Sequence, residues 1–495
     1  MLTYQLATQN SWWLKKDAMK SDFQIEQFEQ SAISWDPRIK YYFQLDSDLV
    51  YTLRGPRQVG KTTLIKQIIR EILSQEIDPR RIFYWTCDLI ESPNELANLI
   101  QQYLQYSKQF AKERRFIFLD EISSVREWQK GIKHLWDTGN LKNTTLLLTG
   151  SHSLDIRKAA ERLPGRRGES ETVLDKILMP MKFAEYVETR DPTMRSRLSE
   201  LGLISFIARK EVLLDLAVGN IPQVIEELNL HSPELSSFLD DYLLTGGIPK
   251  AISDYVKEGS IGRDTFSTYV NATIGDIHRW GKKETYLSQI LRRVIETMGT
   301  HVSWRTLQKE TDIGNQNTVQ DYIDVLTSSF VLCPIFVIDR EKQLPLYGKE
   351  KKIIFHDPFI FHALNGWIRQ SSSPFNQAMS FLANEGKTRL IESVVGDHLI
   401  RLVFNFNPSA DFDPTCNLMY WKTTKDEVDY VIKINQTYLP IEVKYTSSFS
   451  KSDINGMYTF TRSGNSYKGI VITKNLLNNE KNVMAIPAYL FLLLI

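Results

Sequence analysis

The chain has 495 residues, which is too many for a single hydrophobic core, so we expect two to four domains. Hydrophobic residues make up 42% and charged residues 24%, and the formal net charge of +1 gives no overall attraction to nucleic acid or to an anionic membrane. The three cysteines lie far apart and in no metal-ligand spacing, which argues against a disulfide framework and a structural zinc site.

The N-terminal part of the chain predicts a compact domain. Residues 1–48 are rich in aromatic side chains and are expected to pack against residues 49–175, where short apolar runs alternate with helical patterns. Such alternation predicts βαβ units and a parallel sheet, that is, an α/β fold. The expected strands lie at residues 49–53, 81–87, 116–119 and 145–148.

The rest of the chain changes pattern twice. Residues 176–275 look mainly helical, with a sharp loop at residues 245–249. Residues 276–340 predict three helices and a strand and resemble a winged-helix unit. The candidate recognition helix, around residues 315–328, contains two aspartates and no lysine or arginine, which favours a packing module over a reader of DNA. Residues 341–495 begin with a basic segment and then predict the order α-β-β-β-α-β.

A glycine-rich loop lies between the first expected strand and a helical pattern. Its sequence is Gly-Pro-Arg-Gln-Val-Gly-Lys-Thr, and glycine lets backbone N–H groups turn toward phosphates where a side chain would block them. Lys61 can reach the β- and γ-phosphates, and the Thr62 hydroxyl can take a Mg²⁺ position. The loop predicts binding of Mg-ATP by Gly55, Pro56, Arg57, Gln58, Val59, Gly60, Lys61, Thr62 and Thr63.

Two carboxylates follow the third apolar run. Asp120 is expected to hold Mg²⁺ through water, and Glu121 is expected to polarise the attacking water. The next run is followed by Thr149 and Ser151, whose hydroxyls can sense the γ-phosphate, although ordinary turn chemistry explains them equally well. Arg166 is a candidate for stabilising charge in the transition state, and a solvated basic loop is the alternative.

These motifs resemble those of a large bacterial and archaeal ATPase family with an AAA-type or STAND-like core and a C-terminal domain of uncertain function. The resemblance implies the sheet order 5-1-4-3-2, with Glu121 as the catalytic residue and Ser151 as the sensor. Members often have an acidic residue where Lys250 stands, which leaves the role of that position open. The matching motifs lie at residues 55–62, 119–123 with Trp128, 148–151, 163–166, 242–249 and 353–357.

A second set of charged residues lies near the C-terminus. Asp429 falls on one expected strand and Glu442 on the next, with Lys444 on the same face as Glu442. Two carboxylates can hold Mg²⁺, and a lysine can steady a developing charge, while Glu392 on the preceding helix can supply a further acid. The arrangement resembles the restriction-endonuclease-like α/β core of PD-(D/E)XK nucleases. The alternative is a retained fold whose charged residues merely pair with one another.

A nuclease also needs a basic route for a polyanion. Lys422 and Lys425, together with residues 349–352, can provide one, although a solvated face explains them equally well.

The sequence therefore predicts an ATPase, with ATP and Mg²⁺ as cofactors, whose nucleotide state controls a nuclease-like module acting on DNA. The alternative is a regulatory switch in which an inactive nuclease-like scaffold serves a protein partner or self-association. The chain shows neither a signal-peptide pattern nor an apolar run of about 20 residues, which predicts a cytoplasmic protein without a membrane partner.

Overall fold

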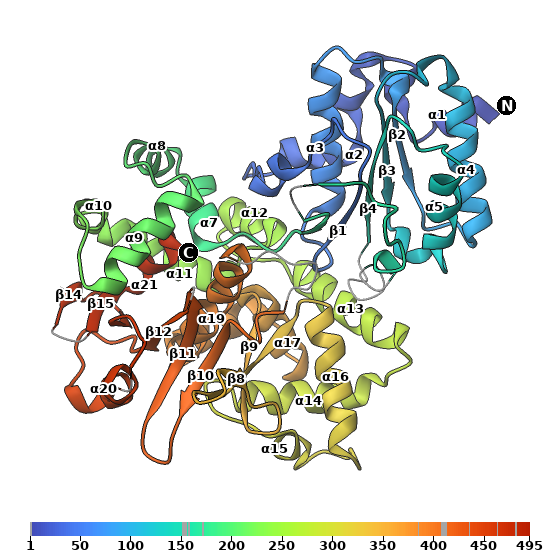
Figure 1. Cartoon of the computed structure of the whole chain (residues 1–495). Coiled ribbons are helices and arrows are strands. Elements are labelled where there is room, and N and C mark those ends of the chain that lie inside the picture. The colour runs from blue at the N-terminus through green and yellow to red at the C-terminus, as the bar shows by residue number, and fades with distance from the viewer. Residues whose placement is uncertain are drawn as a thin grey trace. The chain divides into compact units, whose positions relative to one another are not determined.

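Contacts divide the chain into two compact units, one built mainly from residues up to Met179 and the other from Pro180 onward (Figure 1). The predicted helical, winged-helix-like and nuclease-like segments therefore fall within a single compact unit, and their finer division stays a prediction. In the ranges described below, no helix is both long enough and apolar enough to cross a membrane. The computed structural model describes residues 2–150, 156, 159–170, 173–384, 386–406, 413–434, 436–462, 464–480 and 483–495.

Unit 1 contains a five-stranded sheet in which all neighbouring strands pair in parallel. The strand order is β2-β3-β4-β1-β5, which is the order implied by the family resemblance. Four strands lie where apolar runs predicted them, whereas β5 is only three residues long and contains two charged residues, so it left no apolar run. The strands are β1 Val50–Arg54, β2 Ile82–Thr86, β3 Arg115–Asp120, β4 Thr144–Thr149 and β5 Asp175–Ile177.

Helices cover both faces of this sheet, with α2 and α3 on one face and α1, α4 and α5 on the other (Figure 1). Apolar side chains of α4 and α5 form a core with Phe83, Ile117 and Leu148 of the strands. Helix α3 begins at the end of the glycine-rich loop, so its N-terminus lies at the carboxyl edge of the sheet. The helices are α1 Leu2–Ala7, α2 Phe23–Gln30, α3 Lys61–Ser74, α4 Pro93–Tyr106 and α5 Trp128–Asp137.

The N-terminal segment covers the free edge of strand β2, which is the last strand of its sheet. The Asn10 amide donates to the Tyr84 carbonyl at 3.0 Å and accepts from the Tyr84 N–H at 2.7 Å. The indole N–H of Trp13 donates to the Ile82 carbonyl at 2.8 Å. Side chains thus satisfy backbone groups that another strand would otherwise pair with.

Unit 2 starts with a run of helices, as predicted for residues 176–275. Three further helices and a strand follow, again in the predicted order, and β6 pairs antiparallel with β9. The comparison of this segment with a winged helix stays a prediction. The elements are α7 Phe183–Arg190, α8 Pro192–Glu200, α9 Phe206–Val218, α10 Gln223–Asn229, α11 Ser232–Thr245, α12 Pro249–Glu258, α13 Arg263–Arg279, α14 Glu284–Glu296, α15 Trp304–Gln308, α16 Gln316–Ser328, β6 Leu332–Phe336, β7 Ile338–Asp339, β8 Leu344–Pro345 and β9 Lys351–Phe355.

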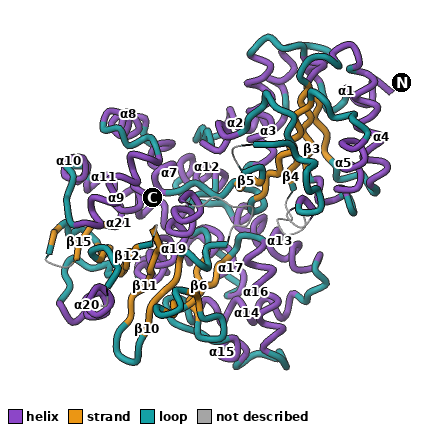
Figure 2. The backbone as a smooth tube through the Cα atoms, in the orientation of Figure 1, coloured by secondary structure: helices purple, strands orange, loops and turns teal. Residues whose placement is uncertain are grey.

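The C-terminal part of unit 2 is built on a mixed sheet of order β10-β11-β12-β13-β15-β14. Strands β10, β11 and β12 are antiparallel neighbours, whereas β12, β13 and β15 run parallel. From α19 to β13 the elements follow the predicted order α-β-β-β-α-β, and Figure 2 shows the strands beside α19 and α20. The elements are α17 Pro358–Ile368, α18 Pro374–Ala383, α19 Gly386–Phe406, β10 Leu418–Lys422, β11 Glu427–Ile434, β12 Thr437–Val443, α20 Asn455–Arg462, β13 Gly469–Thr473, β14 Asn478–Asn479, β15 Val483–Pro487 and α21 Ala488–Leu494.

Two of the motifs that matched the ATPase family, at residues 242–249 and 353–357, meet at the start of unit 2. The Gly247 N–H donates to Asp357 Oδ2 at 2.7 Å, and the Met181 N–H donates to the Gly247 carbonyl at 2.8 Å. A Cβ atom on Gly247 would lie 2.1 Å from the Met181 carbonyl oxygen, so only glycine fits there. The contacts of Gly247 with Asp357 and Met181 therefore fix the backbone where these two motifs meet.

A buried charged cluster lies next to this contact. Arg401 pairs with Asp397 at 2.7 Å and also donates to the Pro180 carbonyl. Asp397 pairs on its other oxygen with His356 Nδ1 at 2.7 Å. Burial by itself would raise the pKa of Asp397, but Arg401 and His356 outweigh it and lower that pKa. The cluster ties helix α19 to His356, which directly follows strand β9, and to the first residue of the unit.

Candidate functional sites

The glycine-rich loop of unit 1 uses backbone conformations that few residues adopt. Gly55 has φ 151°, Gln58 has φ 61° and Gly60 has φ 102°. A Cβ atom on Gly55 would lie 2.1 Å from the Leu178 carbonyl oxygen, whereas one on Gly60 would meet nothing within 4 Å. Gly55 is therefore required by a close approach, and Gly60 by its left-handed conformation alone.

Three side chains that the sequence assigned to the nucleotide and its Mg²⁺ lie together at this loop. The Lys61 ammonium donates to the carbonyl oxygens of Gly55 and Pro56 at 2.9 and 2.8 Å, so it lies across the loop. The Thr62 hydroxyl donates to Asp120 Oδ2 at 2.7 Å. Burial raises the pKa of Asp120. This hydroxyl–carboxylate pair is a donor set of hard oxygens, which is what Mg²⁺ prefers, so the residues present fit the ion.

Two residues near Asp120 were missed by sequence reasoning. The Tyr84 phenol donates to Asp120 Oδ2 at 3.1 Å, and its ring lies 3.6 Å below the ammonium of Lys66. Lys66 is buried and pairs with Asp22 at 2.9 Å, and burial lowers the pKa of Lys66. In the sequence, Tyr84 is one more aromatic residue of an apolar strand, so no local pattern indicated its contact with Asp120.

Glu121, the predicted catalytic residue, and Thr149 lie where β3 and β4 end. Glu121 directly follows β3 with φ 50°, and its N–H donates to Asp120 Oδ1 at 3.2 Å. Thr149 is fully buried at the end of β4, and within the described ranges its hydroxyl has no hydrogen-bond partner. A buried hydroxyl without a partner is costly, so a polar ligand there would be favourable. Ser151 lies outside the described residues.

Arg166 is not brought to the glycine-rich loop. Its guanidinium pairs with Asp137 at 2.6 Å, at the C-terminal end of α5. The neighbouring Arg167 exchanges hydrogen bonds with Val50, the first residue of β1, at the amino edge of the sheet. The reason is topological, because β5 runs parallel to β1 and the chain must first return to the amino edge. A role in hydrolysis would require Arg166 of a second copy of the chain.

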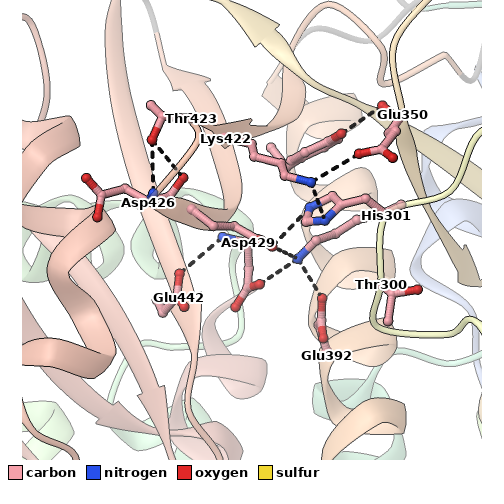
Figure 3. Close-up of polar contacts among 12 residues, drawn as sticks. Thr300, His301, Glu350, Glu392, Lys422, Thr423, Asp426, Asp429 and Glu442 are labelled. Atoms are coloured by element: carbon pink, nitrogen blue, oxygen red, sulfur yellow. Dashed lines mark hydrogen bonds and ion pairs between the residues drawn. The ribbon is translucent and has the colours of Figure 1, made fainter.

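The charged residues predicted in the C-terminal part do converge, in unit 2. Asp429 on β11 and Glu442 on β12 exchange contacts across the strand pair: the Asp429 N–H donates to Glu442 Oε2 at 3.2 Å. Lys444 pairs with Glu442 at 2.8 Å, and Glu392 of α19 points to the same place (Figure 3). Burial raises the pKa of Glu442 to about 8. In the part of the chain that the structure describes, no three His, Cys, Asp or Glu side chains are grouped to hold a metal ion.

A lysine that the sequence assigned to a basic surface segment lies inside this cluster. Lys352 is a buried residue of β9, and its ammonium lies 2.5 Å from Asp429 and 2.9 Å from Glu392. Lys351 is buried as well, over the ring of Trp304 at 4.0 Å. Neither lysine is therefore available as a route for a polyanion, and neither belongs to a solvated face. A strand with a buried charged residue is recognised in a sequence when charged and apolar residues alternate. Lys351 and Lys352 are adjacent, so the sequence shows no such alternation.

The cluster opens into a cleft of about 1120 Å³. Among the described residues, the lining includes seven acidic side chains and four basic ones, which leaves a formal charge of −3, or −2 when the buried Lys352 behind three of these carboxylates is counted. Lys425 is among the basic residues, whereas Lys422 pairs with Glu350 at 3.1 Å outside it. A negative cleft repels a polyanion.

The loop at the carboxyl edge of a parallel sheet, with the Thr62–Asp120 contact beside it, defines a P-loop ATPase-like domain. Residues 47–187, most of which lie in unit 1, match a family model described as an AAA domain. Residues 237–371 and 387–491 match two models described as domains of unknown function.

Similar proteins are known from archaea and bacteria. An uncharacterised protein of Methanocaldococcus jannaschii is 27% identical over 219 residues, which is 44% of this chain and 41% of that protein. One from Haemophilus influenzae is 23% identical over 313 residues, 61% of this chain and 65% of that protein. The chain thus spans less than two thirds of the length of these two relatives.

Among solved structures, a Walker-type ATPase of Pyrococcus abyssi aligns with 71% of this chain and 97% of its own, with a TM-score of 0.38 and 14% identity. The Orc1 protein of Aeropyrum pernix in complex with DNA aligns with 74% of this chain and 97% of its own, with a TM-score of 0.27 and 12% identity.

Proposed function

We propose that the protein is a Mg²⁺-dependent ATPase whose nucleotide state acts as a switch on unit 2. The observation that carries the proposal is the 2.7 Å hydrogen bond between the Thr62 hydroxyl and Asp120, because it joins the helix after the P-loop to the strand that precedes Glu121. The buried Thr149 hydroxyl supports a polar ligand at the same edge of the sheet.

Each residue then has a defined task. The loop N–H groups and Lys61 bind the phosphates, and Thr62 and Asp120 hold the ion. Bound Mg²⁺ would neutralise charge that develops on the phosphates. Glu121 orients a water molecule and accepts its proton. A transition-state arginine would come from a second copy, with Arg166 as the candidate, which would make self-association part of turnover.

Lys61→Ala is expected to weaken ATP binding at least about 100-fold, because it removes the ammonium that faces the phosphates. Isothermal titration of the full chain with ATP and Mg²⁺ measures the affinity. Lys130→Ala is the matched control, since Lys130 is an exposed lysine paired with Glu127 at 2.6 Å. Equal affinities of Lys61→Ala and the parent protein would contradict the proposed site.

For the C-terminal part, we propose a nuclease-like domain that serves as a scaffold for a protein partner. The ion pairs of Lys352 and Lys444 with the carboxylates and the negative formal charge of the cleft support this reading. The competing hypothesis is Mg²⁺-dependent cleavage of DNA, which the convergence of Glu392, Asp429 and Glu442 favours.

Nicking of supercoiled plasmid by the full chain separates these hypotheses. With Mg²⁺ or Mn²⁺, and with or without ATP, we expect no nicking above the level seen with Glu442→Ala and Lys444→Ala. Nicking by the parent protein that both variants lose would establish the nuclease and refute the scaffold.

A further inference from the structure

The ammonium of Lys352 lies among three carboxylates of the C-terminal cluster. Its distances are 2.5 Å to Asp429 Oδ1, 2.9 Å to Glu392 Oε1 and 3.0 Å to Glu427 Oε1. The side chain is only 3% exposed, so water does not screen these contacts. Figure 3 draws the polar contacts of Glu392, Asp429 and Glu442. The three oxygens thus converge on one cationic nitrogen that belongs to the protein.

The remaining oxygens of the two predicted metal ligands also have partners. Asp429 Oδ2 accepts from the Val443 N–H at 2.9 Å. Glu442 Oε2 accepts from the Asp429 N–H, and its Oε1 pairs with Lys444 at 2.8 Å. Each carboxylate therefore points one oxygen at the backbone of the neighbouring strand and the other at a lysine. These carboxylates do not fit a divalent ion while the lysines are present. An ion bound to them would lie next to an ammonium at hydrogen-bond distance from the same carboxylates, and the two positive charges would repel each other.

Three carboxylate oxygens lie within 3.0 Å of the ammonium of Lys352, and such close opposite charges favour the charged form of the lysine. A buried positive charge beside several carboxylates offsets their mutual repulsion as a bound cation would.

We infer that Lys352 takes the place of a divalent cation in the C-terminal cluster, so that the native cluster holds no metal and removal of the ammonium opens a divalent-cation site. The site would be formed by Asp429, Glu392 and Glu427, with Glu442 beside them. Its ligands would be hard carboxylate oxygens, which suit Mg²⁺ or Mn²⁺. The inference builds on the proposed scaffold role, and it assigns the reason for that role to one residue.

Titration of the nucleotide-free full chain with MnCl₂, followed by electron paramagnetic resonance of free Mn²⁺, tests this directly. Lys352→Met keeps the length of the side chain and removes its charge, and we expect it to bind one Mn²⁺ at least about tenfold more tightly than the parent protein. Lys352→Arg keeps the charge and is expected to show no gain. Lys61→Met makes the same substitution in the P-loop and is also expected to show no gain.

The double variant Lys352→Met/Asp429→Asn locates the new site, because without the Asp429 carboxylate the gain in Mn²⁺ affinity should disappear. The inference is overturned if the parent protein already binds one Mn²⁺ and Asp429→Asn abolishes that binding. This test does not need Lys352→Met, so it remains valid if that variant does not fold. Equal Mn²⁺ affinities of a folded Lys352→Met and the parent would overturn it as well. The scaffold role and the present inference can fail separately. If the parent protein nicks no plasmid but binds Mn²⁺ at Asp429, the scaffold role stands and the inference about Lys352 is wrong.

Discussion

Glu121→Gln is expected to leave ATP binding unchanged and to lower the turnover number at least about 100-fold. Glutamine keeps the size of the side chain and its hydrogen-bonding capacity, but it cannot accept the proton of the attacking water. Thr62 and Asp120 remain, so the ion and the phosphates are still held. Phosphate release at saturating ATP measures turnover, and titration with ATP in the same buffer measures affinity.

The control for this variant is Glu127→Gln. Glu127 lies six positions further along with a similar left-handed backbone, φ 54° against 50°, and it pairs with Lys130 on the surface. The same chemical change there should leave turnover within about twofold of the parent protein. Unchanged turnover in Glu121→Gln would show that another group accepts the proton.

Arg401→Met is expected to lower the free energy of unfolding of unit 2 by about 3–5 kcal/mol. The substitution leaves the buried Asp397 without its strongest partner and the Pro180 carbonyl without its donor. Urea denaturation followed by circular dichroism measures the loss. ATP binding reports separately on unit 1 and should persist at urea concentrations where unit 2 has unfolded.

An exposed ion pair provides the comparison. Arg292 pairs with Glu296 at 3.0 Å on the surface of α14, with 70% of the arginine side chain exposed. Arg292→Met should therefore cost at most about 1 kcal/mol. If Arg401→Met costs no more than Arg292→Met, the buried cluster does not stabilise the start of unit 2.

The meeting of the glycine-rich loop with Asp120 was predictable because its signals are local. The glycine-rich loop and the Asp120–Glu121 pair each lie next to an apolar run, and a parallel sheet brings the carboxyl ends of such runs to one edge. Strand β5 was harder, since three residues with two charges carry no apolar pattern. The position of Arg166 was hard to predict for a related reason, because only the topology of β5 reveals that the chain has already returned to the opposite edge.

The C-terminal cluster contains contacts that sequence patterns predict and others that they do not. The spacing of Asp429, Glu442 and Lys444 on neighbouring strands predicted their meeting, and Glu392 joined them from the helix before. Lys352 comes 40 residues before Glu392 and 77 before Asp429 along the chain, so its contacts depend on tertiary packing alone. A predicted role for Glu392 and Asp429 could not anticipate a lysine that pairs with both of them.

The side chains that cover the outer edge of β2 have a consequence for how the P-loop domain of unit 1 can be isolated. The AAA-domain match begins at residue 47, yet the groups that occupy the outer edge of the sheet come from Asn10 and Trp13. A shortened chain starting at residue 47 would expose the hydrogen-bonding groups of Ile82 and Tyr84 as a template for a foreign strand. Such a fragment would tend to polymerise edge to edge, so the boundary of sequence similarity is a poor place to cut this protein.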